Sequence, residues 1–458
     1  MAVWNQTTIS NLGRYATLSA DYYMPEYSNA EARMKIISSH VTSLNRVANP
    51  RYPITYGVLK PREVTESSCR IVRIHNSENL FIFGSDLPPI SDNQFEEYRR
   101  SEVRKGDIVI AIGGYIGPLG IISDNEKLRI NINRHLARVA PDATRIDPYY
   151  LTAYLASSIS QTLLQREIRG AVQAGINIAD LKLHPVYLSS KLEQKAIGDL
   201  VRKAEQRLID SRRAYTQAQQ LLESELGLDN LRFDKPVGYA ARFSEVGLAD
   251  SFKAGRIDAQ CFSPEVVFHE NWLLKHANCD RLSVLLSSTA KGRQQTEVET
   301  GPTDYCSIKH ITSREIVGAS KANPSAGTPN ATKNDLLLAI TGATIGKIGI
   351  VNRYDNLVYS GDMLRLRVND GISPNYLLLT LDHHLGQLQF NRWITGSTNG
   401  HLAPRDVGRV LIPRLAEETE DQIAGLVAES FEKRQESEQL LHQAKSRVEQ
   451  LIEEAVQS

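Results

Sequence analysis

The stretch KGDIVIAIGG at residues 105–114 is repeated as KNDLLLAITG at residues 333–342, and five of the ten positions are identical. In each copy a polar turn leads into an apolar run of strand length, which ends at a glycine-rich loop. The following glycines also correspond, Gly117 with Gly346, after an insertion of one residue in the second copy. We therefore expect the chain to contain one folding unit twice.

The similarity extends on both sides of this stretch. Three further pairs of segments agree in order: 20–25 with 259–264, 69–74 with 306–311, and 147–151 with 373–377. Gly170 and Asp180 then match Gly396 and Asp406 at one constant offset. Agreement at so many ordered points predicts two copies of a unit of roughly 220 residues.

Each copy should continue with a second apolar strand, a loop and strand pair, and a helix. The loop and strand pair at 130–139 resembles that at 359–368. Pro148 and Pro374 suit the first turn of the helix, where Asp147 or Ser373 would form its N-cap. We expect this helix to be amphipathic.

The clearest periodic pattern is helical and closes each copy. Two long helices are predicted, at about 191–226 and 417–455, with apolar residues at the alternating spacing of a coiled-coil seam. The seam residues are Ile197, Val201, Leu208, Tyr215, Leu222, Ile423, Val427, Leu441 and Val448. Ser430, Arg434 and Ser437 make the middle of the second seam polar and weak.

Some 37 residues of helix span roughly 55 Å, too long to bury a whole stripe against one small domain. We therefore expect the two helices to pair with each other, antiparallel if a pseudo-twofold axis relates the copies. The alternative is that each helix packs on its own domain. Seam residues left exposed would bind partner subunits.

These patterns predict an α+β chain of two tandem, similar α/β domains, each followed by a long helix, with the helices paired as an antiparallel coiled coil of pseudo-twofold symmetry. The expected boundaries are 1–190 and 230–415 for the domains, and 191–229 and 416–458 for the helices.

Composition narrows the class of protein. The chain has 458 residues, of which 41% are hydrophobic and 23% charged, and no apolar run long enough for a membrane span. The start lacks the layout of a secretory signal, and the four scattered cysteines indicate neither a zinc site nor a disulfide framework, so a cytoplasmic location is expected. The net charge is zero, but both domains are mildly basic and residues 416–458 hold 11 acidic and 4 basic side chains.

Catalytic motifs are weak. The loop at 342–347 lacks the spacing of a phosphate-binding loop, although Lys347 could contact a phosphate. The segment at 147–150 resembles the Asp-Pro-Pro-Tyr element of amino-methyltransferases without its second proline, and its repeat reads Ser-Pro-Asn-Tyr. We expect His383 and His384 to lie on a helix surface, and we predict no metal site or catalytic residue.

Two domains held apart by paired helices could bind two separated sites on one rigid, rod-shaped ligand, and duplex DNA is such a ligand. Asn and Gln can pair with adenine, and Arg and Lys with guanine or phosphate. The candidate DNA-binding residues of the first domain are Tyr56, Lys60, Tyr115, Asn131, Asn133, Arg134, Gln173 and Asn177. Those of the second are Lys291, Arg293, Gln294, Thr344, Lys347, Asn399 and His401.

The duplicated order of domain and helix resembles the specificity subunit of type I restriction-modification systems. LEQKAI at 192–197, EDQIA at 420–424, the strand and loop stretch at 335–350 and PITYG at 53–57 carry the likeness, which extends along essentially the whole chain. It implies two target recognition domains that select a bipartite DNA sequence, one half-site each, in a chain that is itself not an enzyme and binds no cofactor.

The resemblance also implies partners. Two modification subunits would bind S-adenosylmethionine and methylate adenine, and two translocating restriction subunits would join them for cleavage. The helix pair would set the unread spacer and, with its apolar and acidic surface, hold the modification subunits. Two alternatives stay open: a specificity subunit of another phage-defence methylation complex, and a non-catalytic scaffold that binds proteins.

Overall fold

The computed structural model describes residues 20–57, 61, 64–77, 80–124, 128–170, 174–229, 231–240, 258–396 and 400–458. The chain forms two compact units: unit 1 is Met1–Ile209 with Arg434–Ser458, and unit 2 is Asp210–Lys433. Each of the two long helices therefore contributes one half to each unit. No helix among the described residues has the length and apolar character that a membrane crossing requires.

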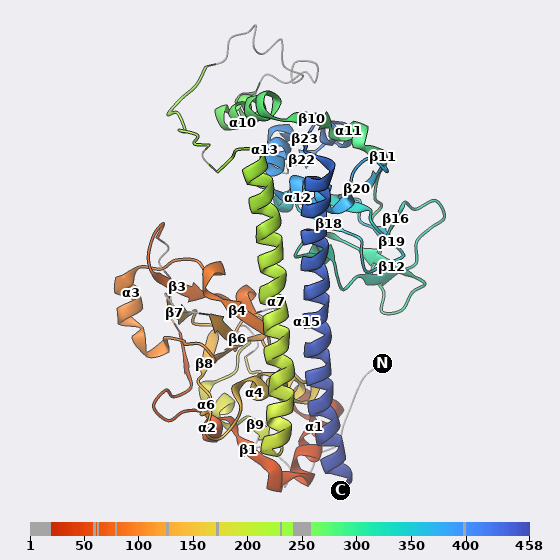
Figure 1. Ribbon diagram of the computed structural model, residues 1–458. Coiled ribbons are helices and arrows are strands. Elements are labelled where there is room, and N and C mark those ends of the chain that lie inside the picture. Colours follow the sequence, from red (N-terminus) through yellow and green to blue (C-terminus); the bar gives the residue numbers. More distant parts are fainter. Residues whose placement is uncertain are drawn as a thin grey trace. The chain divides into compact units, whose positions relative to one another are not determined.

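Unit 1 is built on a mixed sheet of five strands (Figure 1). In sheet order these are β2 (Thr55–Tyr56), β8 (Leu136–Val139), β5 (Ile108–Ala111), β6 (Leu119–Asp124) and β4 (Leu80–Phe83). A parallel pair, β3 (Cys69–Val72) and β7 (Arg129–Ile132), packs on one face, and β1 (Val41–Ser43) pairs with β9 (Pro185–Tyr187). The helices of this unit are α1 (Pro25–Ile36), α2 (Leu44–Val47), α3 (Asp92–Glu97), α4 (Pro148–Leu155), α5 (Ser158–Arg166) and α6 (Ile178–Leu183).

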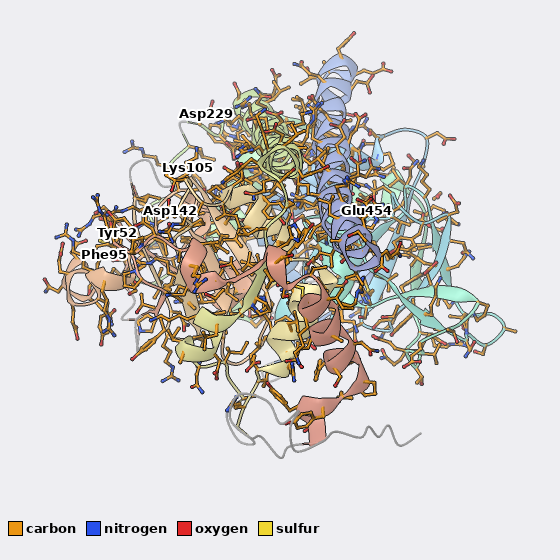
Figure 2. The ribbon with its side chains drawn as sticks, turned by 90° about the horizontal axis from the view of Figure 1, so that it is seen from below. Tyr52, Phe95, Lys105, Asp142, Asp229 and Glu454 are labelled. Carbon is orange, nitrogen blue, oxygen red and sulfur yellow. The ribbon has the colours of Figure 1, made fainter. Side chains whose placement is uncertain are left out.

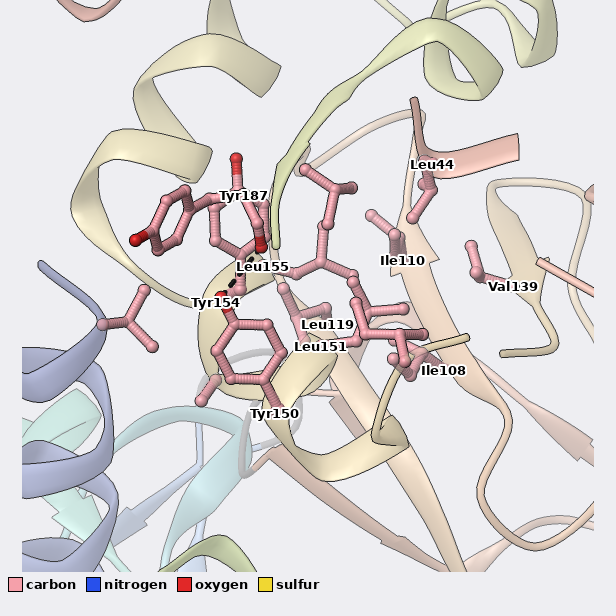
Figure 3. Close-up of a cluster of buried hydrophobic side chains, with 14 of the residues drawn as sticks. Leu44, Ile108, Ile110, Leu119, Val139, Tyr150, Leu151, Tyr154, Leu155 and Tyr187 are labelled. Atoms are coloured by element: carbon pink, nitrogen blue, oxygen red, sulfur yellow. Dashed lines mark hydrogen bonds between the residues drawn. The ribbon is translucent and has the colours of Figure 1, made fainter. Parts of the chain in front are cut away.

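Strand β5 is apolar at every position because both faces of the sheet are covered. Ile108 and Ile110 join a core that includes α4 and the long helices, whereas Val109 and Ala111 pack with the strands of the smaller sheet. Figure 3 shows the first of these clusters, with Ile108 and Ile110 near side chains of α4.

Helix α4 begins as expected but is not amphipathic. Asp147 is its N-cap, and the carboxylate accepts hydrogen bonds from the backbone N–H groups of Tyr149 and Tyr150 at 2.9 and 3.2 Å. Residues 150–155 are all buried. The expectation of one polar face was wrong because the helix lies inside the core.

Unit 2 repeats this plan with additional strands. Its main sheet has the order β11 (Leu286–Lys291), β20 (Met363–Val368), β17 (Leu336–Ala339), β18 (Ile348–Ile350), β14 (Glu315–Ile316) and β13 (Ile311–Thr312). The smaller sheet has the order β15 (Ser320–Ala322), β12 (Thr303–Cys306), β19 (Asn356–Tyr359) and β16 (Asn330–Thr332). Two further pairs are β10 (Asn278–Arg281) with β23 (Leu411–Arg414), and β21 (Ile394–Thr395) with β22 (His401–Leu402).

The helices of unit 2 follow the same succession as those of unit 1, except that α3 has no counterpart among the described residues. They are α10 (Pro264–His276), α11 (Leu282–Leu285), α12 (Pro374–Asp382), α13 (His384–Trp393) and α14 (Pro404–Val407). Ser373 stands at the N-cap of α12, as expected, but its side chain makes no capping hydrogen bond.

Matching hydrogen bonds confirm the internal repeat. The hydroxyl of buried Tyr150 donates to the carbonyl of Tyr187, and that of buried Tyr376 donates to the carbonyl of Pro413, both at 2.8 Å. The first bond is drawn in Figure 3. Both partners lie 37 residues further along the chain. The same core position is thus occupied by the same contact in each unit.

The long helices are α7 (Lys191–Glu225) and α15 (Glu417–Gln457), close to the expected bounds. In unit 1 the Ser437 hydroxyl donates to the Ala204 carbonyl at 2.7 Å, and Arg447 pairs with Glu193 at 3.1 Å. In unit 2 the Ser211 hydroxyl donates to the Ser430 carbonyl at 2.7 Å. Residue numbers rise on one helix as they fall on the other, which confirms the antiparallel pairing; the pseudo-twofold axis stays a prediction.

The seam is buried within the chain. Eight of the nine predicted seam residues are at most 8% exposed, and Leu441 is half-buried against the same core. Each half-helix packs on both the other helix and its own domain core. The expectation of exposed seam residues was therefore wrong, since two surfaces together cover the stripe.

Candidate nucleic-acid interface

Several loops of unit 1 meet at one edge of the main sheet. Strand β8 runs antiparallel to both β5 and β2, so β8 begins where the other two end. The glycine loop at 112–118, the turn at 133–135 and Gly57 therefore lie at the same edge. The segment around Gly175 joins them, because the Ile176 N–H donates to the Ile112 carbonyl at 2.8 Å.

Unit 2 brings the corresponding loops together. Strand β20 is antiparallel to β11 and β17, which places the loop at 340–347, the turn at 360–362 and the segment after Lys291 at one edge. The Leu402 N–H donates to the Ile340 carbonyl at 2.9 Å, the counterpart of the Ile176 bond. We call these two sets the unit 1 loop edge and the unit 2 loop edge.

In each loop edge a glycine lies where the chain passes close to the backbone of a neighbouring segment. A Cβ atom on Gly57 would collide with the Ile132 carbonyl, and one on Gly292 would collide with the Ser360 carbonyl. Only glycine lets the chain pass so close to the neighbouring backbone. The segment at 53–57 is therefore the counterpart of the one at 288–292, a correspondence that the sequence did not reveal.

A clamp that the sequence also did not reveal holds each glycine loop. Gln161 donates from Nε2 to the carbonyls of Gly117 and Leu155 at 3.2 and 2.7 Å. Gln387 donates to those of Gly346 and Leu381 at 3.0 and 2.9 Å. Both glutamines lie on the second helix after the sheet, so a rigid element positions the loop. Their constant offset of 226 residues is the only sequence signal that could have found them.

Most described candidates of unit 1 lie at its loop edge. Tyr115 is 69% exposed and Tyr56 is 39% exposed, while Arg134 and Asn177 are also exposed. The Arg134 guanidinium donates to the neighbouring His135 ring at 3.0 Å. Burial and the nearby Arg134 charge lower the pKa of His135. The neutral ring can accept this hydrogen bond. Lys60 and Gln173 lie outside the described residues.

The described candidates of unit 2 form a similar set. Lys291, Arg293, Gln294, Thr344 and Lys347 are exposed at its loop edge, and His401 is half-buried in β22. The Lys347 ammonium lies 3.5 Å from the Ile308 carbonyl and the Arg293 guanidinium lies 3.4 Å from the Ser325 hydroxyl, while the Gln294 amide oxygen accepts from the Ser360 hydroxyl at 3.2 Å. Asn399 lies outside the described residues. These side chains are available to a ligand.

Two asparagines of unit 1 have structural roles instead. Asn131 is fully buried, accepts a hydrogen bond from the Ser101 hydroxyl at 2.7 Å and donates to the Tyr98 carbonyl at 2.9 Å. It cannot reach a base, so that prediction was wrong; the smaller sheet and residues 98–101 enclose it. Asn133 is half-buried and accepts from the His135 N–H at 2.7 Å, which closes the turn at the loop edge.

His383 was also misplaced. It is 7% exposed, stands at the N-cap of α13, and its Nε2 lies 3.0 Å from a Glu223 carboxylate oxygen of α7. His384 is exposed, as expected. Periodicity alone could not show that His383 faces the long helix. Within the residues that the structure describes, no three His, Cys, Asp or Glu side chains are grouped so as to hold a metal ion.

The comparisons with known proteins agree with the motifs. No family model matches the chain. The type I restriction enzyme EcoBI specificity subunit of Escherichia coli is 33% identical over 165 residues, which are 36% of this chain and 34% of that protein. The chain thus matches about one third of the length of that relative.

Two solved structures also align with the chain. The S subunit of a type I restriction-modification system from M. genitalium is 14% identical, with 91% of this chain and 94% of that one covered and a TM-score of 0.37. The HsdS subunit from Thermoanaerobacter tengcongensis is also 14% identical, with coverages of 89% and 95% and a TM-score of 0.29. Over the 165 residues of the curated match, the expected resemblance to a type I restriction enzyme specificity subunit is confirmed.

Proposed function

We propose that this chain is a sequence-specific DNA-recognition subunit that reads a bipartite target, one half-site with each loop edge. The observation that carries the proposal is the duplication of a rigidly held loop edge whose exposed side chains are suited to base edges and phosphates. The curated match to a specificity subunit supports it. We assign no catalytic role to the chain.

Each loop edge offers both kinds of DNA contact. Lys291, Arg293 and Lys347 in unit 2 can bind guanine or phosphate, and Gln294 can pair with adenine. In unit 1, Arg134 and Asn177 would do the same, and Tyr115 offers an exposed ring for packing on a base or sugar. Lys60, Gln173 and Asn399 remain candidates in the same segments.

The partners follow from this role. Two modification subunits would supply S-adenosylmethionine and flip the target adenine into their own active sites, because the reactive atom is buried in the stacked duplex. Restriction subunits would join for cleavage, and the complex would act in the cytoplasm. The acidic surface of α15 would help to hold the modification subunits.

The test is the methylation pattern of host DNA when the chain is co-expressed with the modification subunit encoded beside it. We expect methylated adenines at one split motif, and loss of this pattern without the chain. Methylation that is indifferent to the chain would contradict the proposal and favour a protein-binding scaffold.

Loop variants assign the half-sites. Lys347→Ala should relax one half of the motif and Tyr115→Ala the other, since the side chains lie in different units. Lys275→Ala, an exposed lysine on α10 away from the loop edge, is the matched control and should leave the motif unchanged. If both loop variants alter the same half of the methylated motif, the assignment of one half-site to each unit is wrong.

The helix pair would set the number of unread base pairs between the half-sites. Deleting one heptad from each helix shortens each by about 10 Å, which corresponds to roughly three base pairs. We expect the spacer in the methylated motif to change accordingly. An unchanged spacer would exclude this role of the helices.

A further inference from the structure

Unit 1 contains a cavity of about 770 Å³ that is lined mainly by cations. Seven basic side chains line it: Arg51, Arg99, Arg100, Arg104, Lys105, Arg138 and Lys182. Only two acidic side chains, Glu102 and Asp107, accompany them. We call this the arginine cavity; Tyr52 and Lys105, which both line it, are labelled in Figure 2. Such an excess of one charge in a concave site attracts anions.

Part of the cavity wall is fixed. Arg138 is 4% exposed and donates to the carbonyls of Glu102 and Pro53 at 2.7 and 3.0 Å, but its Nε has no hydrogen-bond partner. Arg104 lies over the Tyr52 ring at 4.6 Å and donates to the Tyr52 hydroxyl at 2.6 Å. These contacts orient two guanidinium groups before any ligand arrives, and a buried N–H without a partner is costly to maintain.

Most of the other cations are exposed around the rim. Arg51 and Lys105 are exposed, and Lys182 is half-buried. Among the residues that the structure describes, no carboxylate lies within ion-pair distance of these three side chains. The Arg100 guanidinium lies 5.6 Å from the Tyr56 ring centroid. The rim therefore offers exposed positive charge next to a preorganised wall.

The chemistry favours phosphate among anions. Guanidinium groups bind phosphate oxygens through two parallel N–H donors, and lysines add point charges. The volume is within the usual range of about 300 to 1,000 Å³ for ligand sites and exceeds that of a single phosphate. A chain of phosphodiesters fits both the size and the number of cations.

The arginine cavity lies at the opposite end of the main sheet from the unit 1 loop edge. The cavity is lined by residues 52–54 before β2, by Thr55 at its start and by residues 140–141 after β8, whereas the loop edge follows Tyr56 and precedes Leu136. The four residues of β5 separate the two ends by about 13 Å, close to the width of roughly 12 Å of the DNA major groove. A duplex read at the loop edge can thus place one backbone strand at the cavity.

Among the described residues, unit 2 keeps part of this cluster: Arg365 stands at the position of Arg138 and also has a buried Nε without a partner, and Lys333 matches Lys105. In the sheet register, Asp107 corresponds to Asp335 and Ala140 to Arg367, and that arginine is paired with Asp335 at 2.6 Å. Thr332 stands at the position of Arg104. The buried arginine is thus common to both copies, whereas unit 1 has the additional cations Arg51, Arg104 and Lys182 and lacks the arginine that pairs with the aspartate in unit 2.

We propose that the arginine cavity binds the phosphodiester backbone of DNA, independently of sequence, next to the half-site that unit 1 reads. This inference rests on the proposed DNA-recognition function. Its role is to add affinity and fix the register of the duplex, while the loop edges choose the bases.

The test compares two double variants of the full chain. Arg51→Ala with Lys105→Ala removes two rim cations that make no side-chain ion pair. Lys35→Ala with Lys195→Ala is the matched control, since it removes the same charge from two residues that are 70% and 76% exposed on helices elsewhere in unit 1. Fluorescence anisotropy with labelled duplexes, one with and one without the methylated motif, gives affinity at several salt concentrations.

We expect the rim variant to weaken binding to both duplexes by the same factor, about tenfold, and to lower the salt slope by about 1.8. The control should bind like the unchanged chain. Equal salt slopes for the rim variant and the control would overturn the proposal. So would a loss confined to the motif duplex, because the cavity would then read bases.

A thermal-shift arm separates DNA from a small ligand. Inorganic phosphate and ADP are added at millimolar concentration to the unchanged chain and to the rim variant. Stabilisation that the rim variant loses, without any change in DNA affinity, would assign the cavity to a small phosphate ligand and overturn the DNA proposal. If the proposed function itself fails, neither protein distinguishes the motif duplex, whatever the rim variant does.

Discussion

The turns that precede β5 and β17 have nearly the same sequence, but the aspartate of the turn is paired with an arginine only in unit 2. In unit 2, Asp335 is 3% exposed and forms two hydrogen bonds with the Arg367 guanidinium, at 2.9 and 2.6 Å. In unit 1 the position of Arg367 is occupied by Ala140, and burial raises the pKa of Asp107 to about 6. Both aspartates still accept a hydrogen bond from the backbone N–H three residues earlier.

This difference shows that two copies of one fold can carry different charged sites on the same backbone. The turn geometry needs an acceptor at this position, and both copies keep it. Unit 2 neutralises the charge with a dedicated arginine, whereas unit 1 leaves the carboxylate beside the arginine cavity, where Arg138 and Arg104 lower its pKa only in part. Equivalent backbones thus support a closed ion pair in one unit and an open basic cavity in the other.

The largest expected effect on stability comes from removing the equivalent buried tyrosine of each core. Tyr150→Ala and Tyr376→Ala each remove a fully buried ring and its hydroxyl bond, so each should cost about 3–5 kcal/mol in the free energy of unfolding. Hydrogen exchange of α4 and α12 would show which unit loosens. A similar cost in both units is expected; a difference of more than about 2 kcal/mol would contradict equivalent packing.

Arg367→Ala should make unit 2 behave like unit 1. The variant leaves Asp335 buried without its partner, at a cost of about 2 kcal/mol at pH 8, since Arg367 is itself partly exposed. Urea unfolding at pH 8 measures this cost.

Asp335→Asn in the Arg367→Ala background is the control. Because the amide carries no charge, the double variant should recover most of the stability at pH 8. If it is as unstable as the single variant, the cost comes from lost packing of the arginine stem instead.

Asp107→Asn should stabilise unit 1. The folded state raises the pKa of Asp107 above its usual 3.8, so its favourable contribution is complete at low pH and is lost as the pH rises through about 6. The amide can still accept from the Arg104 N–H. We expect a gain of about 1–2 kcal/mol at pH 8 and none at pH 4, measured by urea unfolding. A gain that is independent of pH would contradict the electrostatic explanation.

The smallest effects concern the helix pair. Ser211→Ala and Ser437→Ala each delete one buried hydroxyl bond to a carbonyl of the opposite helix, and each should cost about 1 kcal/mol. Calorimetry of both variants checks this. Ser446→Ala on α15 is the control and should change stability by less than about 0.5 kcal/mol. A loss in only one serine variant would show that the two halves of the helix pair differ.

The sequence predicted what depends on short-range patterns. The repeated strand and loop at 105–114, the Asp147 cap and the two long helices all follow from local chemistry and periodicity. Asn131 was misassigned because its environment is made by a second sheet whose strand β3 lies about 60 residues earlier in the chain. His383 was misassigned because its neighbour Glu223 lies 160 residues away.

The arginine cavity was missed for the same reason. Arg51, residues 99–105 and Lys182 come from separate parts of the chain, and only the sheet register gathers them. Candidate DNA-binding residues on the glycine loops, such as Tyr115 and Lys347, are exposed, because such loops cannot be buried without losing backbone hydrogen bonds. For a candidate inside a short strand, such as Asn131, only the structure shows whether the side chain is exposed.

The composition of unit 1 affects how the chain can be made. Its core includes Ala444, Val448 and Ile452 of α15, which pack with Ile197 and Val201 of α7. During synthesis the first domain emerges long before this helix, so the side of the α7 stripe that packs on α15 stays uncovered until residues 434–458 have been added after unit 2. Unit 2 lies within one continuous stretch and can close first. A nascent chain stopped near residue 433 would therefore expose one side of the apolar stripe around Ile197 and Val201, where a chaperone could bind.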